Sequence, residues 1–374
     1  MRVLLVTAHE FLPFAVTQVL NARNEYCAVV VDEVEPARKF LSQFNYSAEN
    51  VSPLYELPEC VENFFYDCII CMTKGKLLDE IKRCGVPKNK LVTLFGFNTA
   101  ENFLLDRGLR YYQKNFSDFE MFASGMSYSE LGLLPKIFTR KLFNFSRPSQ
   151  DLYFDFQVAK KVISIGGGIL TYALIGLAPY SFYYDESKTS AEESPRLAAY
   201  AFTLKDLHNF WLPVEKYRSL FREEYLNIKM PIDDIEIDEV SVLGDYSKQH
   251  IDFEKRVASR KRIDVWQDRN FPDTREENIK ILDDYLTLCE ENKIVPIMFL
   301  PPMTEGYKKY FSKQKLNEFY FLIRSALAKH QTAKFIDGWA LQGLSDADFL
   351  DVDHLNYNGA IKFSRFLNGF IEKI

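Results

Sequence analysis

The stretch FEMFASGMSYSELGL, residues 119–133, joins an apolar strand to the start of a helix through a glycine. Residues 119–124 read as a buried strand, and Gly125 permits the tight turn that follows it. Ser127 then falls at the opening of the helix. In parallel α/β sheets, functional residues gather at the carboxyl ends of strands, in the loops that run into helices. We therefore expect Ser127 to lie at the functional edge of a sheet.

The segments after this stretch continue the alternation of strands and helices. Strands are predicted at 141–146, 171–178, 294–302 and 333–338, and helices at 149–165 with Ser149 as N-cap, at 274–293 and near the C-terminus. Residues 186–270 are charged and lack a clean period, so we expect a mostly helical insertion there. These patterns predict an α/β domain over residues 116–374, preceded by a helical connector at 101–115.

The first hundred residues predict a separate α/β domain. Apolar strands are expected at 2–8, 27–33, 66–72 and 90–95, with helices between them at 13–22, 35–44 and 75–84. This order resembles the Rossmann type. However, the first turn, TAHEFLPF, has no glycine to let the backbone approach a pyrophosphate. We therefore predict no bound NAD and interpret residues 1–100 as a recognition or assembly module.

Composition excludes several classes of function. Apolar residues make up 47% of the chain, which is ample for two cores, and the net charge of −6 includes no basic block of the kind that binds nucleic acid. The six cysteines form no regular framework, and Cys68 and Cys71 lie inside an apolar run, so we expect buried strand cysteines and a cytoplasmic location. Residues 162–184 carry no charge, but Gly166–Gly168 interrupt them. We expect a helix end, a turn and a buried strand there, not a membrane span.

A second motif, DVDHLNYNG at residues 351–359, offers a partner for Ser127. Serine is a poor nucleophile unless a base removes its proton, and that base must be held in one tautomer. The spacing Asp351-x-x-His354 can close a turn in which Asp351 accepts the Nδ1 proton and Nε2 faces Ser127. Alternatives remain open at this point: Asp353 is equally near, Ser127 could be a plain N-cap, His354 a structural turn residue, and the three residues Asp351, Asp353 and His354 a metal site.

Both motifs together resemble those of the SGNH/GDSL hydrolases. Their Gly-Asp-Ser-Leu block is matched by Gly125-Met126-Ser127-Tyr128, and their Asp-x-x-His block, followed by Asn and Gly, is matched by residues 351–359. The resemblance covers residues 116–374 and implies a flavodoxin-like αβα sandwich. It also implies Ser127 as nucleophile, His354 as base and Asp351 as the acid that orients the base.

The chain departs from this family in the blocks that complete the oxyanion hole, which add a glycine and an asparagine to the N–H of the serine. Here the corresponding segments are SRPSQDL after the second strand and GLAPYSFYYD after the third. Besides Ser127 itself, the candidate donors are Ser149 or Gln150 in the first segment and Tyr180 or Ser181 in the second. Loss of a strong donor costs about 10²–10³-fold in turnover.

The resemblance implies a serine esterase or O-acyltransferase that acts on an acylated carbohydrate, such as a cell-surface polysaccharide or its precursor. No cofactor or metal is expected, and a homo-oligomer or other enzymes of the polysaccharide pathway are the partners left open. The eroded blocks favour an alternative, a non-catalytic carbohydrate-binding or assembly protein on the same scaffold. A nucleotide-sugar enzyme run by the first domain is a third hypothesis, against which the missing glycine loop argues.

Overall fold

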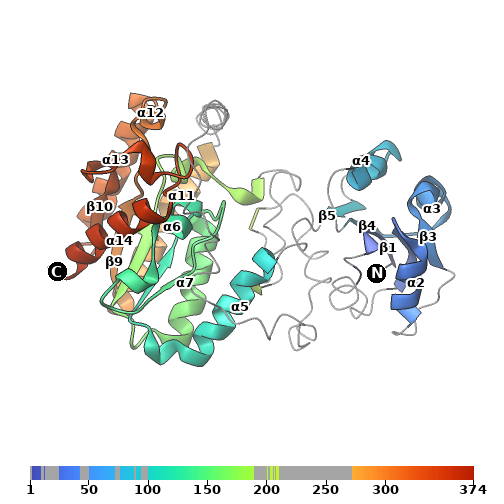
Figure 1. Ribbon diagram of the computed structural model, residues 1–374, viewed down its shortest axis with the longest axis horizontal. Coiled ribbons are helices and arrows are strands. Elements are labelled where there is room, and N and C mark those ends of the chain that lie inside the picture. Colours follow the sequence, from blue (N-terminus) through green and yellow to red (C-terminus); the bar gives the residue numbers. More distant parts are fainter. Residues whose placement is uncertain are drawn as a thin grey trace. The chain divides into compact units, whose positions relative to one another are not determined.

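The computed structural model divides the chain into two compact units, Met1–Arg107 with Ser187–Ile235, and Gly108–Glu186 with Glu236–Ile374 (Figure 1). The structure describes residues 2–9, 12, 25–42, 50–71, 76–87, 90–93, 100–188, 200, 203–204, 206, 208–209 and 272–374. In both units the described strands pair in parallel, as expected for α/β domains. The predicted helix at 13–22 and most of the predicted insertion at 186–270 lie outside the described residues.

The first unit contains a five-stranded sheet of order β3-β2-β1-β4-β5. Its elements are β1 Arg2–Thr7, β2 Glu25–Val31, α2 Val34–Leu41, β3 Val51–Pro53, α3 Leu57–Asn63, β4 Cys68–Cys71, α4 Lys76–Arg83 and β5 Leu91–Thr93. The four predicted strands are present, whereas β3 and α3 were not predicted. β3 has only three residues and ends in a proline, which a sheet tolerates at its edge and which hides the strand from a pattern search.

Burial explains the apolar strands of this unit. Val3–Val6 of β1 are fully buried, as is typical of a parallel sheet that is covered on both faces. Cys68 and Cys71 are buried free cysteines in β4, which confirms their prediction as strand residues.

The second unit contains another five-stranded sheet, of order β10-β9-β8-β6-β7. Its elements are β6 Met121–Ser124, α6 Ser127–Gly132, β7 Leu142–Asn144, α7 Leu152–Gly166, β8 Tyr172–Gly176, α11 Pro272–Glu291, β9 Val295–Leu300, α12 Glu305–Lys308, α13 Lys313–Lys329, β10 Lys334–Asp337 and α14 Tyr357–Ile371. The predicted connector forms α5, Ala100–Asn115, within which the two units meet in sequence. All five strands predicted for this unit are present.

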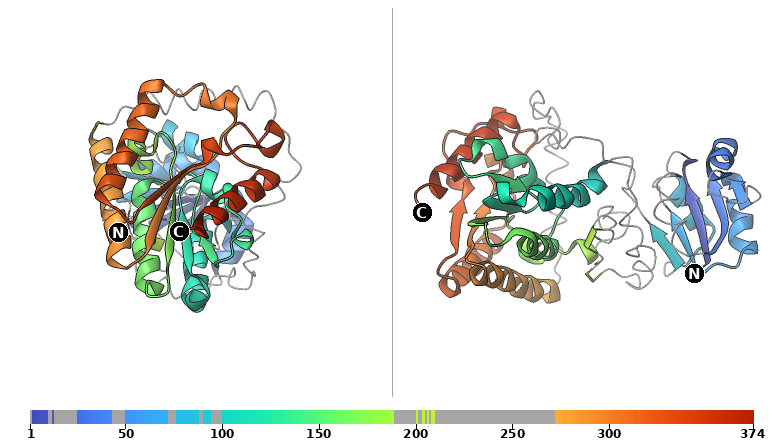
Figure 2. Two further views of the ribbon diagram at one scale, coloured as in Figure 1. Left: turned by 90° about the vertical axis from the view of Figure 1, so that its left-hand side faces the viewer. Right: turned by 90° about the horizontal axis from the view of Figure 1, so that it is seen from below.

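Helices cover both faces of this second sheet. Phe363 and Leu367 of α14 belong to one buried cluster with Ala123 of β6 and Phe299 of β9, so α14 and its neighbour α6 cover one face. α7 and α11 pack against each other, and their strand contacts with β6 and β9 place them on the opposite face (Figure 2). The order of strands reverses between β6 and β8, so the loop after β6 opens at the point where ligands bind in such sheets.

Two local predictions for this unit have different outcomes. Helix α7 begins at Leu152 with Asp151 as its N-cap, not Ser149, because Asp151 Oδ1 accepts a hydrogen bond from the N–H of Phe154. Ser149 instead lies in the preceding turn with φ 60°. The uncharged run at 162–184 forms a helix end, a turn and β8, as predicted. Among the described helices, none is long and apolar enough to cross a membrane.

Candidate active site

The structure brings Ser127, His354 and Asp351 together in the second unit. The Ser127 Oγ lies 2.8 Å from His354 Nε2. On the other side of the ring, His354 Nδ1 lies 2.9 and 3.0 Å from the two carboxylate oxygens of Asp351. The residues therefore form a continuous chain of hydrogen bonds from hydroxyl to imidazole to carboxylate, across 227 positions of sequence.

The loop between β6 and α6 fixes the position of Ser127. Gly125 has φ 140°, and a Cβ there would lie 2.9 Å from the carbonyl oxygen of Gly176, so only glycine suits this turn. Met126 is the N-cap of α6 and Ser127 its first residue. The hydroxyl of Ser127 contacts His354, so the simpler interpretation of Ser127 as an N-cap is wrong.

The turn that carries His354 is held by the residues on either side of it. Phe349 and Leu355 form an antiparallel bridge, and the backbone N–H of Leu350 donates to the carbonyl oxygen of His354. Asn356 caps α14 through its side-chain oxygen, which accepts from the N–H groups of Asn358 and Gly359. The Asn-x-x-Gly part of the motif therefore has a structural role, and α14 then packs against α6 to bring the turn to Ser127 (Figure 1).

The close approach of the chain at Gly359 explains why that position is a glycine. A Cβ on Gly359 would lie only 2.1 Å from the carbonyl oxygen of Asp348. From the other side of the turn, the hydroxyl of Thr304, in the loop after β9, donates to the carbonyl oxygen of Val352 at 2.7 Å. The histidine turn is thus anchored to α14 and to the carboxyl end of the sheet.

Asp351 shapes the turn as well as orienting the ring. Its Oδ1 accepts hydrogen bonds from the backbone N–H groups of Asp353 and His354, at 3.0 and 2.8 Å. The carboxylate is thereby locked before it meets Nδ1, as an orienting acid must be. The three-residue spacing in the sequence was the signal for this arrangement.

Asp353, the equally near acid that the sequence left open as an alternative, also faces the ring. Its Oδ1 lies 3.2 Å from His354 Nδ1, and the side chain is only 1% exposed. Its other oxygen accepts a hydrogen bond of 3.1 Å from the hydroxyl of Tyr128. The preference for Asp351 over Asp353 by spacing alone is therefore incomplete, because both acids meet the same nitrogen.

The two acids change the proton affinity of the histidine. Burial disfavours the imidazolium, but the hydrogen bonds and negative charges of Asp351 and Asp353 outweigh burial and raise the pKa of His354 to about 9. Burial also acts against the charged form of Asp351, yet hydrogen bonds from His354 and Asp353 hold its pKa well below the usual range. The ring is consequently charged at neutral pH and becomes a base in alkaline solution.

The side chains proposed to complete an oxyanion hole are mostly engaged elsewhere. Gln150 donates its amide hydrogens to the carbonyl oxygen of Phe145 and to Asp155, at 3.3 and 2.6 Å. Tyr180 shares a hydrogen bond of 2.8 Å with Tyr128. In this arrangement the amide of Gln150 is not available to an oxyanion.

The other two candidates lie in the loops after β7 and β8. The hydroxyl of Ser181 accepts from the N–H of Ala178 at 2.9 Å, which closes the turn after β8. Ser149 holds the left-handed backbone conformation that glycine adopts most readily, in the loop where the resembling family has a glycine. Of the four, Ser149 alone has a positive φ.

A buried acid behind the loop between β6 and α6 was missed by the sequence analysis. Asp155 on α7 is 2% exposed and receives hydrogen bonds from the N–H of Gly125, the hydroxyl of Ser124 and the amide of Gln150. Burial raises the pKa of Asp155 well above its usual range. An acid four residues into a helix has no motif of its own, and only its contact with Gly125 connects it to the site.

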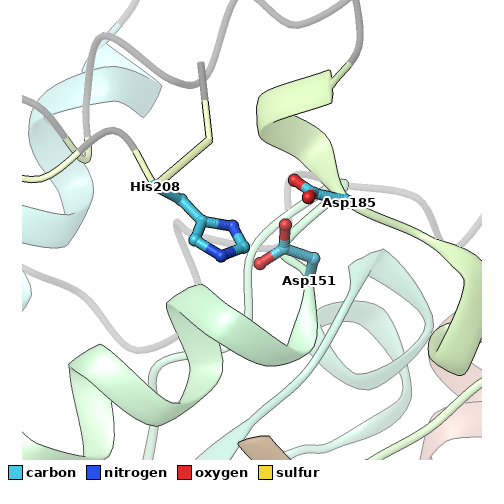
Figure 3. A group of neighbouring side chains, drawn as sticks. All are labelled: Asp151, Asp185 and His208. Carbon is cyan, nitrogen blue, oxygen red and sulfur yellow. The ribbon is translucent and has the colours of Figure 1, made fainter. Parts of the chain in front are cut away.

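Two groups of side chains in the described residues have atoms close enough for a metal ion. In the first, Asp351, Asp353 and His354, the atoms are already joined by hydrogen bonds, so we interpret them as part of the serine site. In the second unit, Asp151 and Asp185 lie beside each other at the start of α7 (Figure 3). Both oxygens of Asp151 accept backbone hydrogen bonds, from Phe154 and Glu186, which assigns this carboxylate a capping role. His208, also labelled in Figure 3, belongs to the first unit.

No protein-family model matches the chain, and no curated protein matches its sequence. The likeness to the SGNH/GDSL hydrolases therefore rests on the two motifs and on the geometry around them.

Proposed function

We propose that the second unit is a serine esterase or O-acyltransferase of the SGNH type. The observation that carries this proposal is the 2.8 Å contact between Ser127 Oγ and His354 Nε2, with Asp351 on the opposite ring nitrogen. A base within hydrogen-bond reach of a hydroxyl, itself oriented by a third group, is the arrangement that activates a serine.

In the proposed reaction, Ser127 Oγ attacks the carbonyl carbon of an ester while neutral His354 takes the hydroxyl proton at Nε2. The tetrahedral intermediate then expels the alcohol, which leaves with the proton that His354 returns, and an acyl-serine remains. Water or a sugar hydroxyl attacks the acyl group in the same way and regenerates the serine. Throughout both steps, Asp351 keeps the Nδ1 proton in place so that Nε2 is the nitrogen that works.

The fold supports the same assignment at a coarser level. In the order of the chain, the strands of the second sheet follow the flavodoxin-like order 2-1-3-4-5, and Ser127 follows the first of them at the switch point. The first sheet has the order 3-2-1-4-5 of Rossmann-type sheets, without a glycine loop after β1. An acylated carbohydrate as substrate, and recognition or assembly as the role of the first unit, follow from the family resemblance alone.

Activity-based labelling tests the proposal directly. A fluorophosphonate should modify wild-type protein at Ser127 in mildly alkaline solution, where His354 is neutral. The label should disappear in Ser127→Ala and fall sharply in His354→Ala, because the base is then absent. Ser129→Ala is the matched control, since it removes a buried hydroxyl two residues away on the same helix and should keep the label.

The alternative, a non-catalytic carbohydrate-binding or assembly protein, makes the opposite prediction. It is favoured by the engagement of Gln150 with Phe145 and Asp155. Folded wild-type protein that remains unlabelled from pH 7 to pH 10 would support this alternative and contradict the esterase.

A further inference from the structure

Two carboxylates meet one nitrogen of His354, and they differ in how they are held. Asp351 is 17% exposed and is fixed by the backbone of its own turn. Asp353 is 1% exposed, lies 3.2 Å from Nδ1, and is fixed by a side chain of another element, Tyr128 of α6. The second acid is therefore tied to the helix that carries the nucleophile.

Tyr128 connects this acid to both the ring and the nucleophile. It follows Ser127 directly, and its ring lies over that of His354 with centroids 4.9 Å apart. Because the hydroxyl of Tyr128 donates its single proton to Asp353, it must accept from Tyr180 in the 2.8 Å contact between the two tyrosines. Burial raises the pKa of Tyr128 well above its usual range, which keeps it a donor.

We propose that Asp353, held by Tyr128, is a positioning residue of this site that shares the Nδ1 proton of His354 with Asp351. The inference rests on the proposed function, in which His354 is the base, and extends it. The site has two orienting acids, and the hydrogen bond from Tyr128 makes the position of the second acid depend on the position of α6, the helix that carries Ser127. The groups that face the imidazole among the described residues are Asp351 and Asp353 from its own turn and Ser127 and Tyr128 from α6. Tyr180 and Tyr307 in turn raise the pKa of Tyr128.

Two substitutions should move the titration of His354 in opposite directions. Asp353→Asn removes a negative charge close to Nδ1, so the pKa of His354 should fall by about 1 unit or more. Tyr128→Phe removes the donor that disperses the charge of Asp353, so that carboxylate accepts more strongly and the pKa of His354 should rise. In the double variant, Tyr128→Phe should add nothing, because the group through which it acts is gone.

The test is an NMR titration of the full-length protein with isotope-labelled histidine rings, between pH 5 and pH 11. The chain has only five histidines, and His354→Gln identifies the signals of His354. Tyr180→Phe is the matched control, because it removes a neighbouring hydroxyl but keeps the hydroxyl of Tyr128 that donates to Asp353, and it should shift the titration less than Tyr128→Phe. In each variant, the pH at which the rate of fluorophosphonate labelling rises should shift by the same amount as the pKa of His354.

The inference is overturned if Asp353→Asn leaves the titration of His354 unchanged, or if Tyr128→Phe shifts it equally with and without Asp353. Should Asp353→Asn fail to fold, Tyr128→Phe alone still decides, since a downward or absent shift contradicts the proposal. The ring titration does not depend on catalysis. A protein that shows the predicted pKa shifts but is not labelled would contradict the esterase and support the sharing of the Nδ1 proton by Asp351 and Asp353. A protein that is labelled but lacks the shifts would support the esterase and contradict that sharing.

Discussion

His354 and His330 lie at opposite ends of the strands of one sheet, His354 at the carboxyl ends and His330 at the amino ends. Each histidine contacts two carboxylates. His330 follows α13 and precedes β10, at the amino ends of the strands, and it is 3% exposed. Its Nδ1 lies 2.9 Å from Glu290 and its Nε2 lies 2.9 Å from Asp283. At His354, both acids meet Nδ1 and leave Nε2 to Ser127.

The two histidines differ in which ring nitrogens contact carboxylates, and this difference separates a structural charge from the proposed base. An ionised carboxylate can only accept, so both contacts of His330 are hydrogen bonds only when both ring nitrogens carry protons, and the charged ring then joins α11 to the end of α13. Burial opposes this charge, but Glu290 and Asp283 outweigh it and raise the pKa of His330. Near His354 the hydroxyl of Ser127 can either donate or accept, so the same ring can lose its Nε2 proton and still be satisfied.

The largest expected contrast is between glutamine substitutions at the two histidines. His354→Gln should lower the rate of ester hydrolysis or labelling by about 10⁴-fold or more, because the base is removed. His330→Gln should leave that rate unchanged but lower the free energy of unfolding by about 1–2 kcal/mol, because two partly buried carboxylates each lose one partner, while Asp283 keeps Lys329 and Glu290 keeps Thr332. Urea unfolding and labelling kinetics on both variants measure the contrast. Loss of labelling in folded His330→Gln would show that the amino edge of the sheet contributes to the site.

The next contrast compares one carboxylate that contacts each histidine: Asp351 at His354 and Asp283 at His330. Asp351→Asn should lower the plateau rate of ester hydrolysis or labelling by at least about 10-fold. The loss should stay below the value of about 10⁴-fold that applies where a single acid orients the base, since Asp353 still holds Nδ1. The rate rises with pH as His354 loses its proton, around its pKa of about 9, and Asp351→Asn should move this rise to lower pH. Asp283→Asn should change neither quantity. A full 10⁴-fold loss in Asp351→Asn would mean that Asp353 cannot substitute for Asp351.

The sequence predicts that Asp351 and His354 lie together but does not predict the cluster at His330, because the residues of that cluster are far apart along the chain. Asp351 and His354 are three residues apart, and a turn suffices to join them. Asp283 and Glu290 are 47 and 40 residues from His330 and become neighbours only when α11 packs against α13. The same limit applies to Asp353, whose orientation is set by Tyr128 from a helix 225 residues away.

The fold follows the same division. Long apolar strands such as β1 and β8, and helices with a clear apolar face, are predicted from the sequence because burial imposes their pattern. The three-residue strand β3 and the capping of α7 by Asp151 are not, because each depends on a few hydrogen bonds and on its neighbours in the sheet.

A smaller effect is expected in the dependence of stability on pH. The pKa of His330 is raised in the folded state, so the stability it contributes is fully present below the unfolded value of about 6.5 and is lost as pH rises through the folded value. The pKa values of Asp283 and Glu290 are lowered, so their contributions are lost as pH falls below about 4. The free energy of unfolding should therefore decline above pH 6.5, by at most about 1.4 kcal/mol per pH unit from His330. In His330→Gln this part of the decline should be absent, and an unchanged slope would contradict the charged ring.

The smallest contrast uses two residues with the same backbone strain at the two edges of the sheet. Ser149, in the turn before α7, and Lys293, in the turn after α11, both have φ 60°, a conformation that costs most L-residues about 1–2 kcal/mol. Glycine removes this cost but adds freedom to the unfolded chain, so each substitution to glycine should raise the free energy of unfolding by up to about 1 kcal/mol.

Lys293→Gly should leave the labelling rate unchanged, since Lys293 lies where α11 leads into the amino end of β9. Ser149 lies two residues after Arg147, whose N–H donates to the carbonyl oxygen of Gly125 at 3.0 Å, so relaxing this turn should loosen the nucleophile loop and slow labelling several-fold. Equal labelling rates in the two glycine variants would show that the strain at Ser149 serves the turn alone.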